Sequence, residues 1–474
     1  MHRKPVKKFA AWAVRCLGLL LLVLLSACAV GPDYQRPAVD TPDRWRISPG
    51  EATTIANVRW WMTFGDPRLN YLVETALKEN LDLRKAAAVV QEYLALAGQA
   101  RADYFPELNL AGKYTRARAS QAALPEAQRQ SVDPLSTEYQ GTLTLSYEID
   151  FWGRIRRANE AAQAQLLSSQ EAQRATIITL VSSVVNSYIQ LKELDLRLEI
   201  SKRTVKSLEE SLRIARARFK AGLISELDVR QAEGTLATTT ATVPDLEKLL
   251  VQKENEISVL LGRYPEPVEV GLRLKDLIMP AVPAGLPSEL LVRRPDILQA
   301  EQNLVAANAK IGLEKAEYFP KFTLTGALGN SSPELSSFFS GPASLWQLGL
   351  SVAAPIFNAG KIADKVEAAE ARSKQAEYDY RKTALTAFKE VENALIGNRK
   401  TQEQVSAVTH QVKAQQQYLH IARLRYDNGQ TSYLEVLDAQ RQLFSAENDL
   451  AQAQSSRIQA MVELYKALGG GWWP

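Results

Sequence analysis

The residue types that perform most enzyme chemistry are scarce in this chain. Of its 474 residues, three are histidine and two are cysteine. His410 and His420 stand ten residues apart on a predicted helix, which turns them about 80° away from a common face. That spacing supports neither a metal site nor a nucleophile and base pair. The glycine run 469–471 follows a predicted helix end, so it indicates a C-cap and a tail. We therefore expect no enzyme, no metal and no cofactor.

Cys28 is the one cysteine whose surroundings indicate chemistry. Five basic residues precede the apolar run Leu17–Leu25, which is too short to span a bilayer but suits the core of a signal peptide. The run ends in Leu25-Ser-Ala-Cys28 and resembles the lipobox of bacterial lipoproteins. This pattern predicts removal of residues 1–27 and a covalent lipid on Cys28. An ordinary cleavage site with an incidental cysteine is the alternative. By resemblance to known lipoproteins, an Asp at position 29 would retain the chain at the inner membrane; this chain has Ala29, so the outer membrane is expected.

Carboxylates near two glycines are the remaining candidates. A helix that begins at Ser432 puts Leu434 and Asp438 at i and i+4 on one face, with Glu435 in its first turn. Copies arranged around an axis would form an apolar ring and a carboxylate ring. The plainer alternatives are coiled-coil core for Leu434, helix capping for Glu435 and Asp228, and a solvated face for Asp438.

Long helices must position these carboxylates. Residues 154–221 contain neither Pro nor Gly, and 68 helical residues would extend roughly 100 Å. Residues 356–473 contain no Pro and are interrupted by Gly397 and Gly429. Apolar residues recur at spacings of four and three, which is typical of coiled coils.

Each long helix is expected to turn back at a glycine, Gly222 or Gly429. The chain restarts with Ser225-Glu-Leu-Asp228 after the first glycine and with Ser432-Tyr-Leu-Glu435 after the second. Both segments predict a capping box at the start of a returning, antiparallel helix.

An internal repeat organises the chain. Ala102-Asp-Tyr-Phe-Pro106 returns as Ala316-Glu-Tyr-Phe-Pro320, and Arg218-Phe-Lys-Ala-Gly222 returns as Arg425-Tyr-Asp-Asn-Gly429. Each copy also holds two segments of period-two alternation, which predict a β-hairpin with one apolar and one polar face. We expect these hairpins within residues 107–152 and 321–355.

Four such strands cannot close a barrel alone, and an open sheet edge in lipid is prohibitive. Other copies must therefore complete the sheet, with 8, 12 or 16 strands for two, three or four copies. The polar faces would then line a water-filled pore. Five of the 57 basic residues fall in the first 27 residues, which leaves 52 basic against 53 acidic residues and argues against a nucleic-acid partner.

Several motifs together identify a family. In chain order, they are Cys28–Pro37, Trp60–Leu69, Arg293-Arg-Pro-Asp-Ile297, the two Tyr-Phe-Pro motifs and Tyr433–Gln440. Over essentially the whole mature chain they resemble the outer membrane factors of tripartite efflux systems, in the TolC-like, lipoprotein (NodT-type) branch. The resemblance implies a mainly α-helical protein with a membrane β-barrel. It further implies a homotrimer with a 12-stranded outer-membrane barrel, continuous with a trimeric α-barrel of antiparallel coiled coils in the periplasm.

The resemblance also implies partners and residue roles. The partners are a periplasmic adaptor protein, an inner-membrane pump of the RND type or similar, and outer-membrane lipid. Leu434 and Asp438 would line the periplasmic constriction, and Asp228, Tyr426 and Glu435 would join the closing network. Where some relatives carry Arg, this chain has Thr431. The tips that meet the adaptor would be formed by Gly222, Leu223, Ser225, Gly429, Gln430 and Ser432.

The expected organisation follows from the repeat and the resemblance. The segments are a signal peptide (1–27), a lipidated N-terminal and equatorial segment (28–80), the first repeat (81–243), an equatorial segment (244–295), the second repeat (296–454) and a C-terminal equatorial end (455–474). The predicted function is a passive efflux duct in the outer membrane, gated at the helix tips. A type I protein-secretion channel and a non-conducting structural envelope lipoprotein are the alternatives.

Overall fold

The computed structural model describes residues 29–39, 41–42, 44–46, 59–120, 122, 133–279 and 287–470. Cys28 and the predicted signal segment 1–27 lie outside the described residues, so the acylation of Cys28 stays a prediction.

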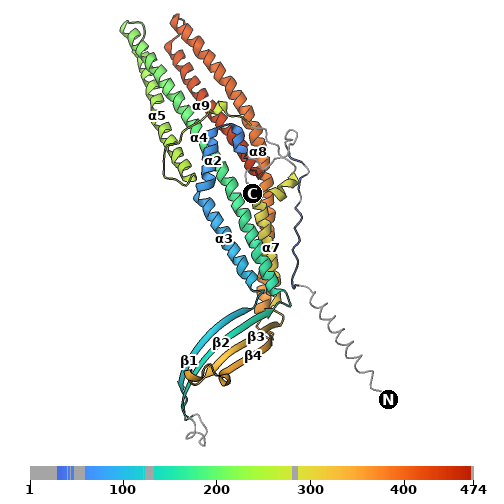
Figure 1. The fold of residues 1–474 in the computed structure, drawn as a ribbon. Coiled ribbons are helices and arrows are strands. Elements are labelled where there is room, and N and C mark those ends of the chain that lie inside the picture. Colours follow the sequence, from blue (N-terminus) through green and yellow to red (C-terminus); the bar gives the residue numbers. More distant parts are fainter. Residues whose placement is uncertain are drawn as a thin grey trace, which may run out of the picture. The chain divides into compact units, whose positions relative to one another are not determined.

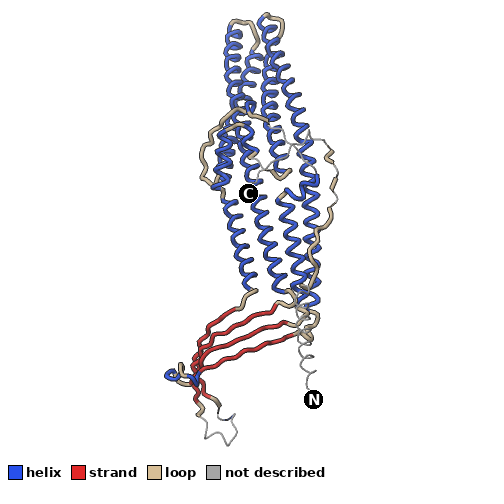
Figure 2. Tube along the Cα trace, turned by 45° about the vertical axis from the view of Figure 1, so that its right-hand side comes forward, coloured by secondary structure: helices blue, strands red, loops and turns tan. Residues whose placement is uncertain are grey.

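The chain is mostly helical and carries one antiparallel sheet (Figures 1 and 2). The helices are α2 (Pro67–Glu79), α3 (Leu81–Ala102), α4 (Arg154–Lys220), α5 (Glu226–Leu260), α6 (Leu290–Arg293), α7 (Pro295–Ala316), α8 (Lys361–Asp427) and α9 (Tyr433–Ala467). The strands are β1 (Glu107–Arg118), β2 (Leu135–Ile149), β3 (Lys321–Ser332) and β4 (Ser344–Ala353). Short 3-10 turns are η1 (Trp60–Phe64), η4 (Leu274–Asp276), η5 (Pro287–Glu289), η6 (Leu335–Ser337) and η7 (Gly341–Ala343).

The sheet has the order β1-β2-β3-β4, so the two predicted hairpins join through β2 and β3. Because successive side chains of a strand point to opposite faces, the pairing register sorts residues into an apolar and a polar face. One directly paired row on the apolar face is Leu110, Leu143, Leu328 and Trp346. The adjacent row on the polar face is Asn109, Thr144, Ala327 and Gln347. The outer edges of β1 and β4 have no strand partner within the described chain.

The long helices match in pairs: α4 and α8 have 67 residues each, and α5 and α9 have 35 each. Gly397 does not interrupt α8, because a single glycine costs a packed helix only about 1 kcal/mol. Likewise α5 continues through Pro244 to Leu260, beyond residue 243 where we expected the first repeat to end. An internal proline removes one backbone hydrogen bond, and the rest of the helix is kept.

Two compact units divide the chain. The first comprises the described residues up to Pro37 together with Gln91–Ser168 and Glu301–Asp379, and it contains the sheet. The second comprises the described parts of Ala38–Val90, Ser169–Ala300 and Tyr380–Pro474. These units do not follow the segment boundaries expected from the repeat, which stay a prediction.

The core of the second unit surrounds the middle of α4. Tyr188 on α4 is fully buried, together with Phe64 and Leu69 of the N-terminal segment. Trp60 stacks on Tyr465 of α9 with ring centroids 4.9 Å apart. The Trp60-Trp61 pair is thus a core element that joins η1 to the end of α9.

In the first unit, residues 29–37 form an extended N-terminal strap that lies against α4 and α7. The Val30 amide donates to the Trp152 carbonyl at 3.0 Å, and Arg36 makes two 2.6 Å bonds to the Glu301 carboxylate. A Cβ on Gly31 would come within 2.4 Å of the Gly312 backbone, so glycine is required for this close approach. The strap therefore accounts for the Gly-Pro-Asp-Tyr-Gln-Arg-Pro motif.

In the part of the chain that the structure describes, no helix has both the length and the apolar character needed to cross a membrane.

Candidate functional site

Two glycine turns connect the long helices to the helices that run back beside them, α4 to α5 and α8 to α9 (Figure 1). Gly222 and Gly429 have φ values of 71° and 70°, in the left-handed region that favours glycine. The Leu223 amide donates to the Arg218 backbone carbonyl at 2.9 Å, and the Gln430 amide donates to the Arg425 backbone carbonyl at 2.8 Å. These bonds occupy carbonyls at each helix end, so both turns close by the same backbone device.

The six residues predicted to form the adaptor-contact tips all lie at these turns. Gly222, Leu223, Ser225, Gly429, Gln430 and Ser432 are exposed in the single chain. Leu223 is a large apolar side chain among them, with 72% of its surface accessible.

The capping box predicted at Ser225 is confirmed. The Asp228 amide donates to Ser225 Oγ at 3.4 Å, and the Ser225 amide donates to Asp228 Oδ2 at 3.0 Å. Ser225 Oγ also lies 2.8 Å from that carboxylate oxygen. Within the described chain the hydrogen bonds of Asp228 all go to Ser225, so this carboxylate caps α5 and does not reach the other predicted gate residues.

The capping box predicted at Ser432 is wrong. The Ser432 side chain makes no capping hydrogen bond to α9. The Glu435 carboxylate instead accepts a bond from Thr431 Oγ and one from Arg425 Nη1 at 3.3 Å. Because Arg425 in the last turn of α8 draws Glu435 across the turn, the carboxylate does not fold back onto the Ser432 amide. Thr431 thus contacts Glu435 together with Arg425 from α8.

Tyr426 lies at the contact between the two helical hairpins. Its ring packs against Tyr433 with centroids 5.2 Å apart, and the Arg218 guanidinium of α4 lies 4.5 Å from its centroid. Arg218 also approaches Asp427 at 3.4 Å. The Tyr426 hydroxyl is buried without a hydrogen-bond partner in the described part of the chain. Tyr426 therefore joins the hairpins through ring contacts.

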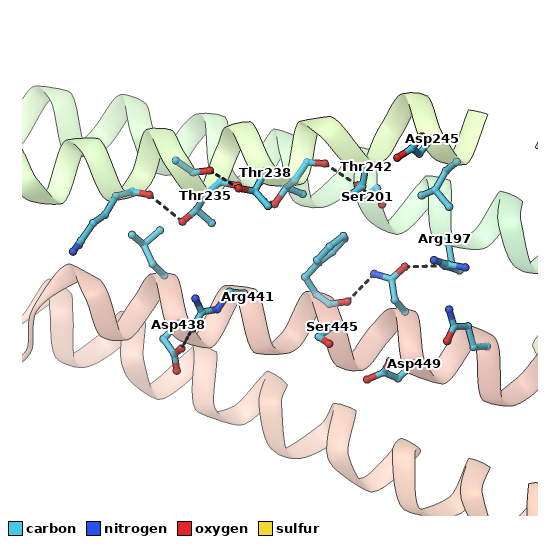
Figure 3. A pocket seen from close by; sticks show the side chains of 18 of the residues that line it. Arg197, Ser201, Thr235, Thr238, Thr242, Asp245, Asp438, Arg441, Ser445 and Asp449 are labelled. Carbon is cyan, nitrogen blue, oxygen red and sulfur yellow. Dashed lines mark hydrogen bonds and ion pairs between the residues drawn. The ribbon is translucent and has the colours of Figure 1, made fainter. Parts of the chain in front are cut away.

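Leu434 and Asp438 line one groove, as their spacing predicts. The groove has a volume of about 870 Å³ and lies between α5 and α9, with Arg197 and Ser201 contributed by α4 (Figure 3). Leu434 is 54% exposed. Threonines 235, 238, 239 and 242 of α5 lie on the opposite wall.

Asp438 is paired within its own helix. Its Oδ1 lies 2.6 Å from Arg441 Nη2, and its Oδ2 accepts from Gln442 Nε2 at 2.5 Å. The charges of Asp438 and Glu435 also act on Tyr418: burial first, and then these two carboxylates, raise the pKa of its phenol. The site therefore combines carboxylates with a guanidinium. Our sequence analysis missed Arg441, although its i+3 position after Asp438 is a signal for such a pair.

A buried ion pair supports the first hairpin from α2. Lys192 Nζ of α4 lies 2.9 Å from Asp66 Oδ2, and the two side chains are 1% and 0% exposed. Asp66 also caps α2 through the Arg68 amide at 2.9 Å and accepts from the Tyr188 hydroxyl at 3.0 Å. Burial acts to raise the pKa of Asp66, but the hydrogen bond and charge of Lys192 and the bond from Tyr188 together lower it. Asp66 is therefore held ionised.

A second arginine cluster supports the other hairpin. Arg294 makes two bonds to Asp296, at 2.9 and 2.7 Å, and one to Glu390 of α8 at 2.7 Å. It also donates to the Ala467 carbonyl in the last turn of α9 at 2.8 Å. Burial acts to lower the pKa of Arg294, but its carboxylate partners raise it. This accounts for the Arg-Arg-Pro-Asp motif, whose second arginine ties α8 to the end of α9.

Among the described residues, no cluster of His, Cys, Asp and Glu has the arrangement needed to hold a metal ion. His410 and His420 are both exposed on α8.

Comparison with known proteins gives a consistent result. The family model described as outer membrane efflux protein matches residues 72–263 and 286–470. The solvent efflux pump outer membrane protein SrpC of Pseudomonas putida is 36% identical, covering 97% of this chain and 98% of its own. The cation efflux system protein CusC of Escherichia coli is 34% identical, covering 97% and 99%. The solved outer-membrane channel OprN superposes with a TM-score of 0.88 at 33% identity, covering 94% of this chain and all of the other.

Proposed function

The chain belongs to the outer membrane efflux protein family, whose members are transport conduits and not enzymes, and we propose that it forms a gated, trimeric exit duct. In this proposal it receives cargo from a periplasmic adaptor and an inner-membrane pump of the RND type or similar, and conducts it passively out of the cell. The relatives are components of efflux pumps, which favours efflux over protein secretion or a purely structural role.

The observation that carries the proposal is the two-faced sheet with two open edges. Leu110 and Trp346 on the apolar face are 83% and 80% exposed and belong to one continuous apolar row, which is a surface that a membrane or a partner covers. The edges of β1 and β4 must find partners before the sheet can lie in lipid. Three copies with four strands each would close a 12-stranded barrel with its apolar face toward lipid and its polar face toward water. The matched helix lengths support the tandem repeat.

The N-terminal strap supports a lipid anchor on Cys28. The Val30 amide is bonded to the Trp152 carbonyl, where β2 passes into α4. Trp152 stacks on Phe319 at 4.6 Å and contacts Phe151 at 4.8 Å. Aromatic residues gather at membrane interfaces, so this cluster marks the periplasmic surface of the bilayer. Cys28 precedes Val30 by two residues, within reach of that surface.

Constriction at the helix tips is the proposed gate. Leu434 would supply an apolar ring and Asp438 a carboxylate ring in the trimer, with Glu435 and Tyr426 in the contacts that hold the two hairpins together. Asp438 is joined to Arg441, so a ring of guanidinium groups accompanies the carboxylates. The balance between the two rings would set the ion preference of the closed duct.

The cargo does not follow from this chain. Relatives of nearly equal similarity are named for different cargoes, solvents for SrpC and cations for CusC. We therefore propose that the pump and the adaptor select the cargo and that the duct is permissive.

Conductance and reversal potential in planar bilayers test the gate. Asp438→Ala should remove the carboxylate ring and leave Arg441 unpaired, which shifts the preference from cations toward anions and raises basal conductance. Arg441→Gln should strengthen the cation preference. Leu434→Ala should raise conductance without changing ion preference, and its effect should add to that of Asp438→Ala.

Glu403→Gln is the control for Asp438→Ala, because it also removes one negative charge but lies away from the groove on α8, where Glu403 pairs with Lys400. If Asp438→Ala and Arg441→Gln both leave the reversal potential at the control value, these residues do not line the conduction path. If the unmodified protein conducts no ions under any condition, the duct itself is refuted.

A further inference from the structure

The connection between β3 and β4, residues 333–343, is folded down onto the apolar face of the sheet. A Cβ on Gly141 of β2 would come within 2.9 Å of Cζ of Phe338, so this ring sits directly over the glycine. Gly141 lies two residues from Leu143 and therefore shares its apolar face. The Asn330 amide nitrogen donates to the Phe338 carbonyl at 2.6 Å and fastens the connection to β3.

The connection has an ordered internal structure. The Glu334 amide donates to Ser332 Oγ at 3.2 Å, and the Ser332 and Ser337 hydroxyls lie 2.6 Å apart. Phe338 and Phe339 meet edge to face with centroids 5.0 Å apart. The side chains of Leu335 and Phe339 nevertheless stay exposed, at 64% and 88%. Glu334 is the one charged residue in this connection.

Strand geometry places this connection at the height of the membrane. Gly141 lies eight residues along β2 from Ile149, which pairs with Phe322 near the periplasmic aromatic cluster. Eight residues at ~3.4 Å, on a strand tilted by about 40°, rise roughly 21 Å, inside an apolar band about 25 Å tall. The next row on the same face, further from the periplasmic cluster, contains the paired Tyr114 and Tyr139, whose ring centroids are 5.0 Å apart. Together with Phe338 they form a second group of aromatic residues.

We infer that residues 333–343 contact lipid: Phe338 fills the trough over Gly141, and Leu335 and Phe339 insert into the outer leaflet of the bilayer. The inference rests on the proposed membrane barrel and extends it to a segment that connects strands. The apolar row of Leu110, Leu143, Leu328 and Trp346 is adjacent, on the same face, to the row of Gly141 under Phe338, so the occupant of this surface is the same lipid that covers the row.

The position of Phe338 over Gly141, called the seat below, also provides a hydrogen-bond partner for a polar side chain on the lipid-facing side. Asn330 lies on the lipid-facing side, in the same row as Gly141, where an amide without a partner would be costly. The Phe338 carbonyl accepts from that amide, and the Phe338 ring lies over Gly141, the residue paired with Asn330. The connection thereby converts a polar position on the lipid face into an apolar one.

An environment-sensitive nitrobenzoxadiazole label on single introduced cysteines tests the inference. The chain has two cysteines of its own, Cys16 and Cys28, so the parent protein labelled in parallel gives the background. Full-length protein is placed in phosphatidylethanolamine and phosphatidylglycerol vesicles with or without brominated acyl chains. The label at Phe339→Cys should be blue-shifted and quenched by the brominated lipid as strongly as at Leu348→Cys. The label at Thr144→Cys on the polar face should not be quenched.

The outcomes separate the two levels of the argument. Quenching at residue 348 without quenching at residue 339 overturns the lipid contact and leaves the barrel in place. A blue shift at residue 339 that is insensitive to brominated lipid assigns the surface to a neighbouring protein copy and also overturns it. Absence of quenching at both positions refutes the membrane barrel, and the inference falls with it.

A matched pair of glycine variants tests the seat. Gly141→Val should displace Phe338 and reduce the quenching at residue 339, whereas Gly112→Val should not, because a Cβ on Gly112 meets nothing within 4 Å. Gly112 and Gly141 are directly paired, so the two variants add the same side chain to the same row of the sheet. Phe338→Ala should give the same loss as Gly141→Val without altering a strand. Unchanged quenching in both Gly141→Val and Phe338→Ala would overturn the seat.

Discussion

The two helical hairpins have the same backbone arrangement and differ in the side-chain contacts that support it. Both have a long helix of 67 residues and a returning helix of 35, and both turn at a glycine with φ near 70°. The returning helix α9 contains 15 buried residues, including Tyr433, Val436 and Leu437. The returning helix α5 contains six, including Val229, Ala232 and Leu246.

The interior of α5 is also the less regular of the two. It contains Gly234 and Pro244, and α9 contains neither residue type. The hydroxyls of Thr235, Thr238 and Thr239 donate to carbonyls of their own helix, a pattern that favours helix bending. We infer that the first hairpin has less buried packing than the second and depends more on polar contacts, among them the Asp66–Lys192 pair and the Ser225 cap. The second hairpin is held along its length by packing.

Removing one partner of the buried pair should have the largest effect. Lys192→Met leaves Asp66 buried without its counter-charge and should cost about 3–5 kcal/mol of unfolding free energy. The double variant Lys192→Met, Asp66→Leu should recover part of that loss, because the unpaired charge is gone but leucine can neither cap α2 nor accept from Tyr188. Helix melting by circular dichroism in detergent measures both.

Lys202→Met is the control on the same helix, because its pair with Glu247 is half exposed and should contribute under about 1 kcal/mol. Acid gives an independent reading. The pKa of Asp66 is lowered from 3.8 in the fold, so its contribution is complete above about pH 4 and declines as the pH falls through the lowered value. Asp66→Asn should abolish that part of the acid dependence. Equal losses for Lys192→Met and Lys202→Met would contradict a special anchor of the first hairpin.

Arg294→Lys should have the next largest effect, and it should loosen the second hairpin. Lysine keeps the charge but cannot bond Asp296, Glu390 and the Ala467 carbonyl together, so we expect a loss of about 1.5–3 kcal/mol. Amide hydrogen exchange should quicken at the end of α9 and not in α5. The neighbouring Arg293→Lys, whose partner is Glu289, should change neither quantity.

The helix caps offer a finer comparison of the two turns. Ser225→Ala removes a capping hydroxyl and should cost about 1 kcal/mol, whereas Ser432→Ala should be nearly neutral because Ser432 makes no capping bond. Thermal melts of the two variants, measured side by side, compare these two losses of stability. A larger loss for Ser432→Ala would restore the capping box at the second turn.

The smallest expected effect is a gain. A Cβ on Gly234 or on Gly397 meets nothing within 4 Å, so alanine at either position should stabilise its helix by about 0.5–1 kcal/mol. Only Gly234→Ala should slow amide exchange in the segment 234–244. If both variants slow exchange in α5 alike, α5 has no local weakness of its own.

Local patterns allowed much of this fold to be predicted. Alternation located the four strands, and Gly222 and Gly429 marked both turns, because strand faces and left-handed turns depend on neighbouring residues. The spacing of Leu434 and Asp438 correctly predicted a shared surface. The family resemblance supplied the functional class.

Contacts between residues that are far apart in the sequence could not be predicted from local patterns. Nothing near Lys192 indicates Asp66, and nothing near Arg294 indicates the Ala467 carbonyl, which is 173 residues away. The capture of Glu435 by Arg425 depends on how α8 meets α9 in space. A capping motif states only that the local bond is possible; the competing partner across the turn decides whether it forms.

The N-terminal strap has a consequence for the order of folding. Arg36 and Glu301 are 265 residues apart in the sequence. The Pro32 carbonyl accepts a hydrogen bond from the Asn308 side chain, 276 residues away. Contacts of such sequence separation form late, because the intervening chain must be ordered before the closure entropy is recovered. We therefore expect the first residues of the described chain to be among the last to fold. Gly31 can pack against Gly312 only after α7 has formed. Docking of the strap therefore requires that the second half of the chain has already folded.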